Sequence, residues 1–356
     1  MTGTVYSAYK MFGFPQKLAD VQMQKWSAPL HVRLKPTNRC NHRCWYCGYQ
    51  HQNNLSLGMG ADPTDMISEE KMQEIIEDLV ALRVQAVTFS GGGEPLLYPH
   101  LLPSVAALAQ AGLALGMITN GALLTGSRAE SLANRMRWIR VSLDGWDDDS
   151  YARYRGIKSG AFSQLMENLK QFSAIKGNTQ LGVAINLDAD NVKHLESLVP
   201  RLKACGVEQV KLAGCVVADD AATNSAYHQP FFAQTKSVIQ KLSERLRDET
   251  FQIIDRYHLW SEQTRTYSAC GMISWLTVIA ADLNVYSCQD KAYHASGWLG
   301  SLKDQRFAQA WFDPDLVERA RALDPRRDCA HHCVSHQKNI ILAEWQDLDR
   351  DHIAFV

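Results

Sequence analysis

The sequence has little net charge and lacks any long apolar run. Its 37 Lys and Arg residues nearly balance 38 Asp and Glu residues, which gives a formal net charge of −1. The protein as a whole is therefore not attracted electrostatically to nucleic acid or to an anionic membrane surface. No segment reaches the ~20 consecutive apolar residues of a membrane-spanning helix. We therefore expect neither a nucleic-acid partner nor a membrane partner.

The sequence also lacks a secretory signal, internal repeats and low-complexity segments. Its first residues, MTGTVYSAYKMFGFPQK, show no basic stretch followed by an apolar one. We expect a cytoplasmic location, where thiols stay reduced. The nine cysteines are then better explained as metal ligands or reactive thiols than as disulfides.

Short β-like runs alternate with helical patterns in the first two thirds of the chain. A helix is predicted to start at Ser68 as its N-cap and to bury an apolar stripe from Met72 to Val80. Alternation of this kind predicts a parallel sheet, and six units favour an α/β fold with a partial (β/α)6 TIM-like barrel. A flat doubly wound sheet is the alternative. The six runs are 31–35, 86–90, 113–119, 138–143, 181–187 and 208–212.

The pattern changes after a helix predicted over 231–247. Two runs, 273–280 and 284–287, predict a hairpin, and a second helix over about 304–323 ends before Pro325. We expect a small C-terminal α+β domain. The expected division is an N-terminal arm (1–29), a core (30–225), a linker helix (226–265) and the C-terminal domain (266–356).

Three cysteines, Cys40, Cys44 and Cys47, lie within eight residues. Three thiolates can hold three corners of a 4Fe–4S cluster. The fourth corner would stay open, which is typical of a catalytic metal site. A zinc site or three incidental thiols are the alternatives.

The Cys-x3-Cys-x2-Cys spacing resembles the signature of the radical S-adenosylmethionine (SAM) superfamily. The resemblance implies that SAM binds the open iron and is cleaved reductively to a 5′-deoxyadenosyl radical, which abstracts hydrogen from a substrate. It implies an electron donor such as flavodoxin or ferredoxin. Tyr46 matches the aromatic residue usual before the third cysteine, near the adenine of SAM.

A glycine-rich segment, Gly91, Gly92, Gly93 and Glu94, directly follows the second predicted strand. Glycines let a backbone approach a ligand closely. The segment resembles the family's Gly-Gly-Glu motif, which implies a role in holding the amino group of SAM. An ordinary glycine-rich turn is the alternative.

Further polar residues follow other predicted strands. The resemblance assigns Ser142 to the SAM ribose with Asp144 nearby, and Arg155 to the SAM carboxylate, which suits a bidentate guanidinium. Asn120 and Asn186 lie where the family often contacts SAM. A helix cap, a surface charge and local backbone hydrogen bonds are the simpler explanations for these residues. The cysteine loop, the glycine segment, Asn120, Ser142 with Asp144, and Asn186 fall at or near the carboxyl ends of predicted strands, where barrel enzymes build their active sites.

Four late cysteines, Cys270, Cys288, Cys329 and Cys333, supply a closed ligand set. They resemble the auxiliary-cluster domain of radical SAM enzymes in its short "twitch" form, which is related to the SPASM domain. This implies a second 4Fe–4S cluster, with structural zinc or unligated thiols as alternatives. Cys215 follows the sixth strand, and the resemblance to radical SAM epimerases makes it a candidate catalytic hydrogen donor, with simple packing as the alternative.

The substrate is less defined than the chemistry. We expect a small molecule of the sugar or aminocyclitol type, which is oxidised or epimerised. Tyr49, Gln50 and His51 are candidates for contacting it. Radical modification of a ribosomally made peptide is the first alternative; only 39 residues precede Cys40, and they do not resemble a complete leader-binding domain. A non-catalytic iron–sulfur or zinc protein is the second.

Overall fold

Ten strands form one continuous sheet in the computed structural model, which describes residues 6–49, 60–258, 264–329, 332–349, 351–352 and 354–355. Gln50 and His51 lie outside the described residues. The sheet order is β10-β9-β8-β1-β2-β3-β4-β5-β6-β7. The strands are β1 (His31–Leu34), β2 (Ala86–Phe89), β3 (Ala114–Thr119), β4 (Trp138–Ser142), β5 (Gln180–Leu187), β6 (Gln209–Gly214), β7 (Gln252–Asp255), β8 (Leu276–Ile279), β9 (Asn284–Tyr286) and β10 (Trp298–Ser301).

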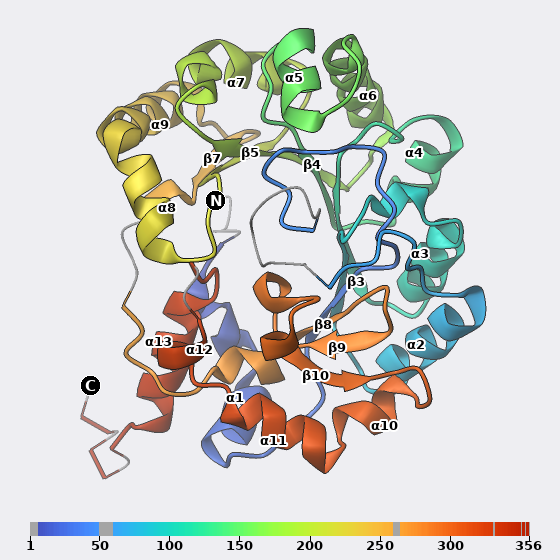
Figure 1. Ribbon diagram of the computed structural model, residues 1–356, viewed down its shortest axis with the longest axis vertical. Coiled ribbons are helices and arrows are strands. Elements are labelled where there is room, and N and C mark those ends of the chain that lie inside the picture. The colour runs from blue at the N-terminus through green and yellow to red at the C-terminus, as the bar shows by residue number, and fades with distance from the viewer. Residues whose placement is uncertain are drawn as a thin grey trace.

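Strands β1 to β7 run parallel and curve around a central space, with helices α2 to α9 on their outer side (Figure 1). This arrangement confirms the partial barrel. The helices are α1 (Pro15–Gln22), α2 (Glu69–Ala81), α3 (Leu101–Gln110), α4 (Gly126–Leu132), α5 (Asp148–Arg155), α6 (Ala161–Ile175), α7 (Leu195–Ala204), α8 (Ala221–His228), α9 (Phe232–Leu246), α10 (Phe307–Trp311), α11 (Pro314–Ala322), α12 (Pro325–Asp328) and α13 (His336–Gln346).

The main core lies between the sheet and this helical layer. Val32 and Leu34 of β1 are fully buried and belong to the same apolar cluster as Ile75 and Leu79 of α2. Side chains alternate along a strand, so Arg33 points to the opposite side, into the central space. Because the inner face is free of this core, it can carry polar residues.

Helix α2 begins where the sequence predicts. The Ser68 side chain accepts a hydrogen bond from the backbone N–H of Lys71 and caps the helix. The apolar stripe is buried from Met72 to Leu79, but Val80 is 39% exposed and lies outside it. The stripe therefore ends one residue earlier than predicted.

Two predictions about the later elements are corrected. Strand β7 falls within the segment expected to be a linker, because its sequence, Gln-Ile-Ile-Asp, does not alternate apolar and polar residues. The helix predicted over 304–323 is two helices, α10 and α11, since the chain starts again at Pro314, which fits the first turn of a new helix.

The C-terminal hairpin extends the barrel sheet. Strand β8 pairs in parallel with β1, and β9 pairs antiparallel with both β8 and β10. The carboxyl end of β1 and the hairpin that carries Cys288 are therefore neighbours. No described helix is both long enough and apolar enough to cross a bilayer.

Candidate functional site

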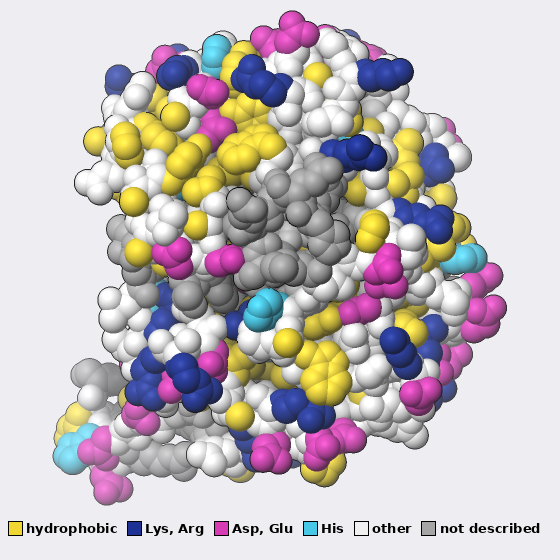
Figure 2. Space-filling model, viewed as in Figure 1, with side chains coloured by type: hydrophobic (Ala, Val, Ile, Leu, Met, Phe, Trp, Pro, Cys, Tyr) yellow, Lys and Arg dark blue, Asp and Glu magenta, His cyan; other side chains and the backbone are white. Residues whose placement is uncertain are grey.

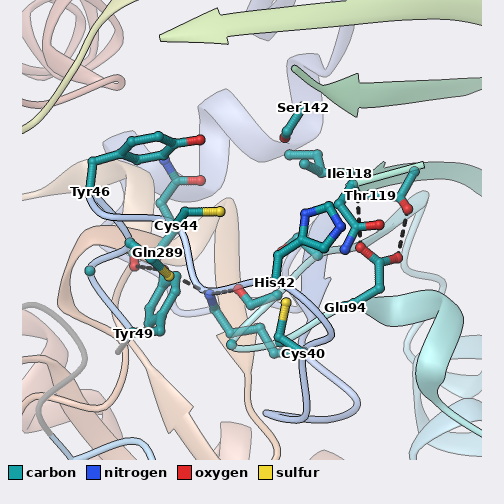
Figure 3. Close-up of a pocket in the computed structure, with 18 of the residues that line it drawn as sticks. Cys40, His42, Cys44, Tyr46, Tyr49, Glu94, Ile118, Thr119, Ser142 and Gln289 are labelled. Atoms are coloured by element: carbon teal, nitrogen blue, oxygen red, sulfur yellow. Dashed lines mark hydrogen bonds between the residues drawn. The ribbon is translucent and has the colours of Figure 1, made fainter. Parts of the chain in front are cut away.

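A cavity of about 410 Å³ opens at the carboxyl ends of the parallel strands. It gathers most of the residues that the sequence singled out: Cys40, Cys44, Tyr46, Cys47, Gly91, Gly92, Gly93, Glu94, Asn120, Ser142, Arg155 and Asn186. Figure 3 shows Cys40, Cys44, Tyr46, Glu94 and Ser142 around this space. Residues from five strand ends thus meet in one place, although their individual roles stay predictions.

The three cysteines lie on the loop after β1. Burial raises the pKa of the Cys40 thiol to about 12 and also raises the pKa of the Cys47 thiol. Thiolates are the form that binds metal, so these cysteines need a nearby positive charge to ionise. A bound iron–sulfur cluster provides such a charge.

Arg155 connects the cysteine loop to β4. One guanidinium nitrogen donates to Cys44 Sγ over 3.3 Å, and the other forms an ion pair with Asp144 at 2.8 Å. Asp144 also accepts hydrogen bonds from the Tyr46 hydroxyl and from the backbone N–H of Asn186. It has a φ of 125°, a backbone conformation that is rare for a residue with a side chain and marks functional sites.

Asp144 is fully buried and is absent from the cavity lining. The structure thus places Asp144 behind the cavity wall, where it holds Arg155 and Tyr46. Neither a simple helix cap nor a solvated surface arginine describes this pair, because the Arg155 and Asp144 side chains are only 4% and 0% exposed.

Glu94 is buried and accepts three hydrogen bonds. They come from the Thr119 hydroxyl at 2.6 Å, the backbone N–H of Asn120 at 2.7 Å and that of Leu96 at 3.0 Å. Burial raises the pKa of its carboxyl, and these donors oppose that rise. A carboxylate offers about four acceptor sites, so one remains for an ammonium group.

The glycines before Glu94 are required by close packing. A Cβ on Gly93 would lie 2.0 Å from the carbonyl oxygen of Arg39, and one on Gly92 would lie 1.9 Å from Oδ1 of Asn38. The glycine segment therefore packs directly on the start of the cysteine loop. Any larger residue would push the two loops apart.

Cys215 lies directly after β6 but is 1% exposed and is absent from the cavity lining, where its neighbour Val216 appears. Its backbone carbonyl accepts a hydrogen bond from His228 at 2.8 Å if that ring nitrogen carries the proton. Its role as a hydrogen donor stays a prediction.

Lys35 is a site residue that the sequence did not single out. Its ammonium group donates to the carbonyl of Gly91 and, over 2.8 Å, to the hydroxyl of Tyr49. Burial lowers the pKa of Lys35 to about 7. The available signal was its place at the end of β1, two residues after Arg33, which puts both side chains on the inner face.

The four late cysteines are half-buried and come together from distant parts of the chain. Burial raises the pKa of Cys329 to about 11 and of Cys333 to about 12, and the charge of Cys270 adds to both. Burial and then the charges of Asp290 and Cys270 raise the pKa of Cys288. These mutual effects require short separations. Asn339 donates to Cys270 Sγ over 3.5 Å.

The first cysteine group suits an iron–sulfur cluster, and a second cluster at the four late cysteines stays a prediction. Among the described residues, no three His, Cys, Asp or Glu side chains converge tightly enough to hold a single metal ion. A four-iron cluster is larger than one ion and takes its thiolates at wider spacing. At the first group, the buried Nε of Arg155 has no hydrogen-bond partner in the described chain. That donor beside the cavity suits the carboxylate of SAM.

Comparisons with known proteins agree with this chemistry. Residues 34–212 match the family described as "Radical SAM superfamily". A PqqA peptide cyclase of Ruegeria pomeroyi is 30% identical over 324 residues, 86% of this chain and 80% of its own length. A dTDP-4-amino-4,6-dideoxy-D-glucose ammonia-lyase of Streptomyces venezuelae is 30% identical over 155 residues, 43% of this chain. The chain spans 30% of the length of that lyase and 40% of the length of two GTP 3',8-cyclases that it also resembles.

A solved structure shares the fold over the whole chain. Streptococcus suis SuiB bound to the precursor peptide SuiA superposes with a TM-score of 0.65 at 12% sequence identity, covering 100% of this chain and 83% of that one. The family match covers the cysteine loop, the glycine segment and the strands that bring them together. This chain belongs to the radical SAM superfamily, whose enzymes bind a 4Fe–4S cluster and SAM.

Proposed function

We propose that this enzyme cleaves SAM reductively and removes a hydrogen atom from a small molecule of the sugar or aminocyclitol type, in an oxidation or epimerisation. The observation that carries the proposal is the single cavity shared by three cysteines, Glu94 and Arg155. When bound, the cluster and SAM supply an electron and a 5′-deoxyadenosyl radical.

The protein groups have separate tasks in this proposal. Cys40, Cys44 and Cys47 hold three irons and leave one open for SAM. Glu94 accepts a hydrogen bond from the SAM ammonium group at its remaining acceptor site. Arg155 donates a hydrogen bond to the SAM carboxylate from Nε, which has no partner in the described chain. Asn120, Ser142 and Asn186 line the same wall and bind the nucleoside.

We also propose that Cys270, Cys288, Cys329 and Cys333 bind a second 4Fe–4S cluster. Four ligands close the coordination of a cluster, so this one transfers electrons and does not bind SAM. Oxidation of a substrate radical releases an electron, and a nearby cluster can accept it. In an epimerisation, a hydrogen atom returns to the substrate radical, and Cys215 is the candidate donor.

The similarity to a peptide cyclase over 86% of this chain supports a second candidate, radical modification of a peptide. The similarity to a dTDP-sugar lyase supports the small molecule but covers only 43% of this chain. Product analysis separates the two candidates. An enzyme with Cys215→Ala that still forms epimerised product at the normal rate would remove the role of that thiol.

Anaerobic reconstitution tests the chemistry directly. We expect about eight iron atoms per chain for two clusters, and release of 5′-deoxyadenosine when SAM and dithionite are added. If a fully loaded enzyme releases no 5′-deoxyadenosine, the proposed function fails. About four iron atoms and one zinc would remove the second cluster alone.

A further inference from the structure

The inner face of the barrel carries three basic side chains from three different strands. Arg33 is on β1, Arg140 on β4 and Lys211 on β6. Each lies between two fully buried apolar residues of its strand, which belong to the core beneath the helices. Side chains alternate along strands, so all three point into the central space. Each is partly exposed, as expected for residues that line a hollow.

These three charges lie within reach of one another. Burial, together with the charges of Arg140 and Arg33, lowers the pKa of Lys211 to about 7. Arg33 shows the same mutual effect, since its pKa is lowered by burial and by Arg140. Asp290 is the carboxylate whose charge opposes this effect at both residues. The charge of Arg256 also lowers the pKa of Lys211, so the basic groups outnumber this carboxylate and leave a net positive charge.

Within the described part of the chain, no ion pair joins Arg33, Arg140 or Lys211 to a carboxylate. The Arg140 guanidinium lies over two rings, 5.0 Å from the centroid of Trp138 and 5.3 Å from that of Tyr6. Stacking orients a guanidinium while leaving its edge N–H groups available. Gly182 faces it, and a Cβ there would lie 3.9 Å from its Nε.

Confining like charges in a sheltered space is unfavourable. Proteins that keep such groups in a cavity often use them on a ligand of opposite charge. The outer surface does not share this bias, because Lys and Arg are interspersed with Asp and Glu over the face seen in Figure 2. The positive charge is thus a property of the barrel interior.

Arg33 joins this interior to the proposed SAM site. It lines the same cavity as Cys44 and Arg155. It precedes Lys35 by two residues on β1, which places it about 7 Å deeper than the residue that contacts the glycine segment. A ligand held here by one end can therefore present its other end to SAM.

We propose that Arg33, Arg140 and Lys211 bind a phosphoryl group, preferably a diphosphate, of the substrate. The proposal rests on the proposed function and narrows its substrate to a phosphorylated small molecule. Three cations suit a diphosphate better than a single carboxylate, because a diphosphate offers more than one negative charge and several acceptor oxygens.

Calorimetric titration of the anaerobically reconstituted protein with inorganic pyrophosphate tests the proposal. We expect saturable binding to the wild type, and Arg140→Gln and Lys211→Gln should each weaken it by about tenfold, as loss of a charged hydrogen bond does. Arg128→Gln is the matched control, because Arg128 is exposed on α4; it should bind like the wild type. Equal binding by all four proteins overturns the proposal.

Two further measurements complete the test. Acetate and glutarate are carboxylate probes, and tighter binding of either than of pyrophosphate overturns the phosphoryl class. Since removal of a half-buried cation can disturb folding, thermal unfolding of the wild type alone is the second measurement. Pyrophosphate should raise its melting temperature, and an unchanged temperature overturns the proposal. Release of 5′-deoxyadenosine from the same sample reports separately on the proposed function.

Discussion

Arg155 donates a hydrogen bond to the Sγ of Cys44 over 3.3 Å. The same guanidinium pairs with Asp144, so the charge next to this thiol is fixed in place. Hydrogen bonds to cluster sulfurs help to set the reduction potential of an iron–sulfur cluster. The Arg155–Asp144 pair therefore holds the cysteine loop in place. We also expect it to influence the reduction potential of a cluster bound there.

Removing one partner of this buried pair should be costly. We expect Arg155→Gln to lower the free energy of unfolding by about 3 to 5 kcal/mol, because the Asp144 carboxylate is left buried without its cation. Chemical denaturation of the metal-free protein measures this cost. The double variant Arg155→Gln, Asp144→Asn should lose less than the sum of the two single variants. Additive losses would contradict the coupling.

Glu94 should act on SAM through its charge. We expect Glu94→Gln to weaken SAM binding by about tenfold, since a neutral amide replaces a carboxylate that accepts from an ammonium. Equilibrium binding of SAM to the reconstituted protein is the measurement. Thr119→Val is the control, because it removes one donor to Glu94 and keeps the charge. Equal loss in both variants would assign Glu94 to the hydrogen-bond network alone.

Cys270 should be needed for the second cluster and dispensable for SAM cleavage. We expect Cys270→Ala to lower the iron content from about eight atoms to about four per chain, while 5′-deoxyadenosine is still released. Cys205→Ala is the matched control and should keep full iron content, since Cys205 lies at the end of α7 in neither cysteine group. Unchanged iron in Cys270→Ala would remove Cys270 from the ligand set.

Lys17 should make stability depend on pH above neutrality. It is 4% exposed and donates to Ser27 and to the carbonyl of Ala28, and burial lowers its pKa from 10.5 to about 8. Between these values the unfolded chain binds more protons than the folded one, so stability rises with pH. Between pH 8 and 10.5, Lys17 should therefore raise the free energy of unfolding by about 3 kcal/mol.

The stability difference between wild type and Lys17→Met measures this contribution. It should shift in favour of the wild type from pH 8 to 10.5. Exposed Lys158 provides the control, because Lys158→Met should show no such shift. A flat difference for Lys17→Met would contradict the effect of burial.

The sequence predicted the parts of the fold that have strong local patterns. All six predicted parallel strands are present within one or two residues, and Ser68 caps α2. Strand β7 was not predicted because its sequence, Gln-Ile-Ile-Asp, does not alternate apolar and polar residues. Hairpin strand β8 starts at Leu276 and not at Ile273, since a short 3-10 helix occupies Gly271–Ser274. Apolar residues suit either conformation, so composition could not separate them.

The site was predictable where several residues form one motif and unpredictable where single residues meet across the fold. The cysteine loop and the glycine segment are local patterns. The contact of Arg155 with Cys44 joins positions 111 residues apart. The inward direction of Arg33 depends on which face of β1 the helices cover, and that becomes known only once the sheet is built.

The hydrogen bond between Tyr49 and Gln289 bears on the assembly of the two proposed clusters. Tyr49 follows Cys47 by two residues, its hydroxyl donates to the carbonyl of Gln289 over 3.0 Å, and Gln289 directly follows Cys288. This hydrogen bond thus links the loop that carries Cys47 to the loop that carries Cys288. Whichever centre is assembled first restrains the loop of the other and lowers the conformational entropy that the second assembly must remove.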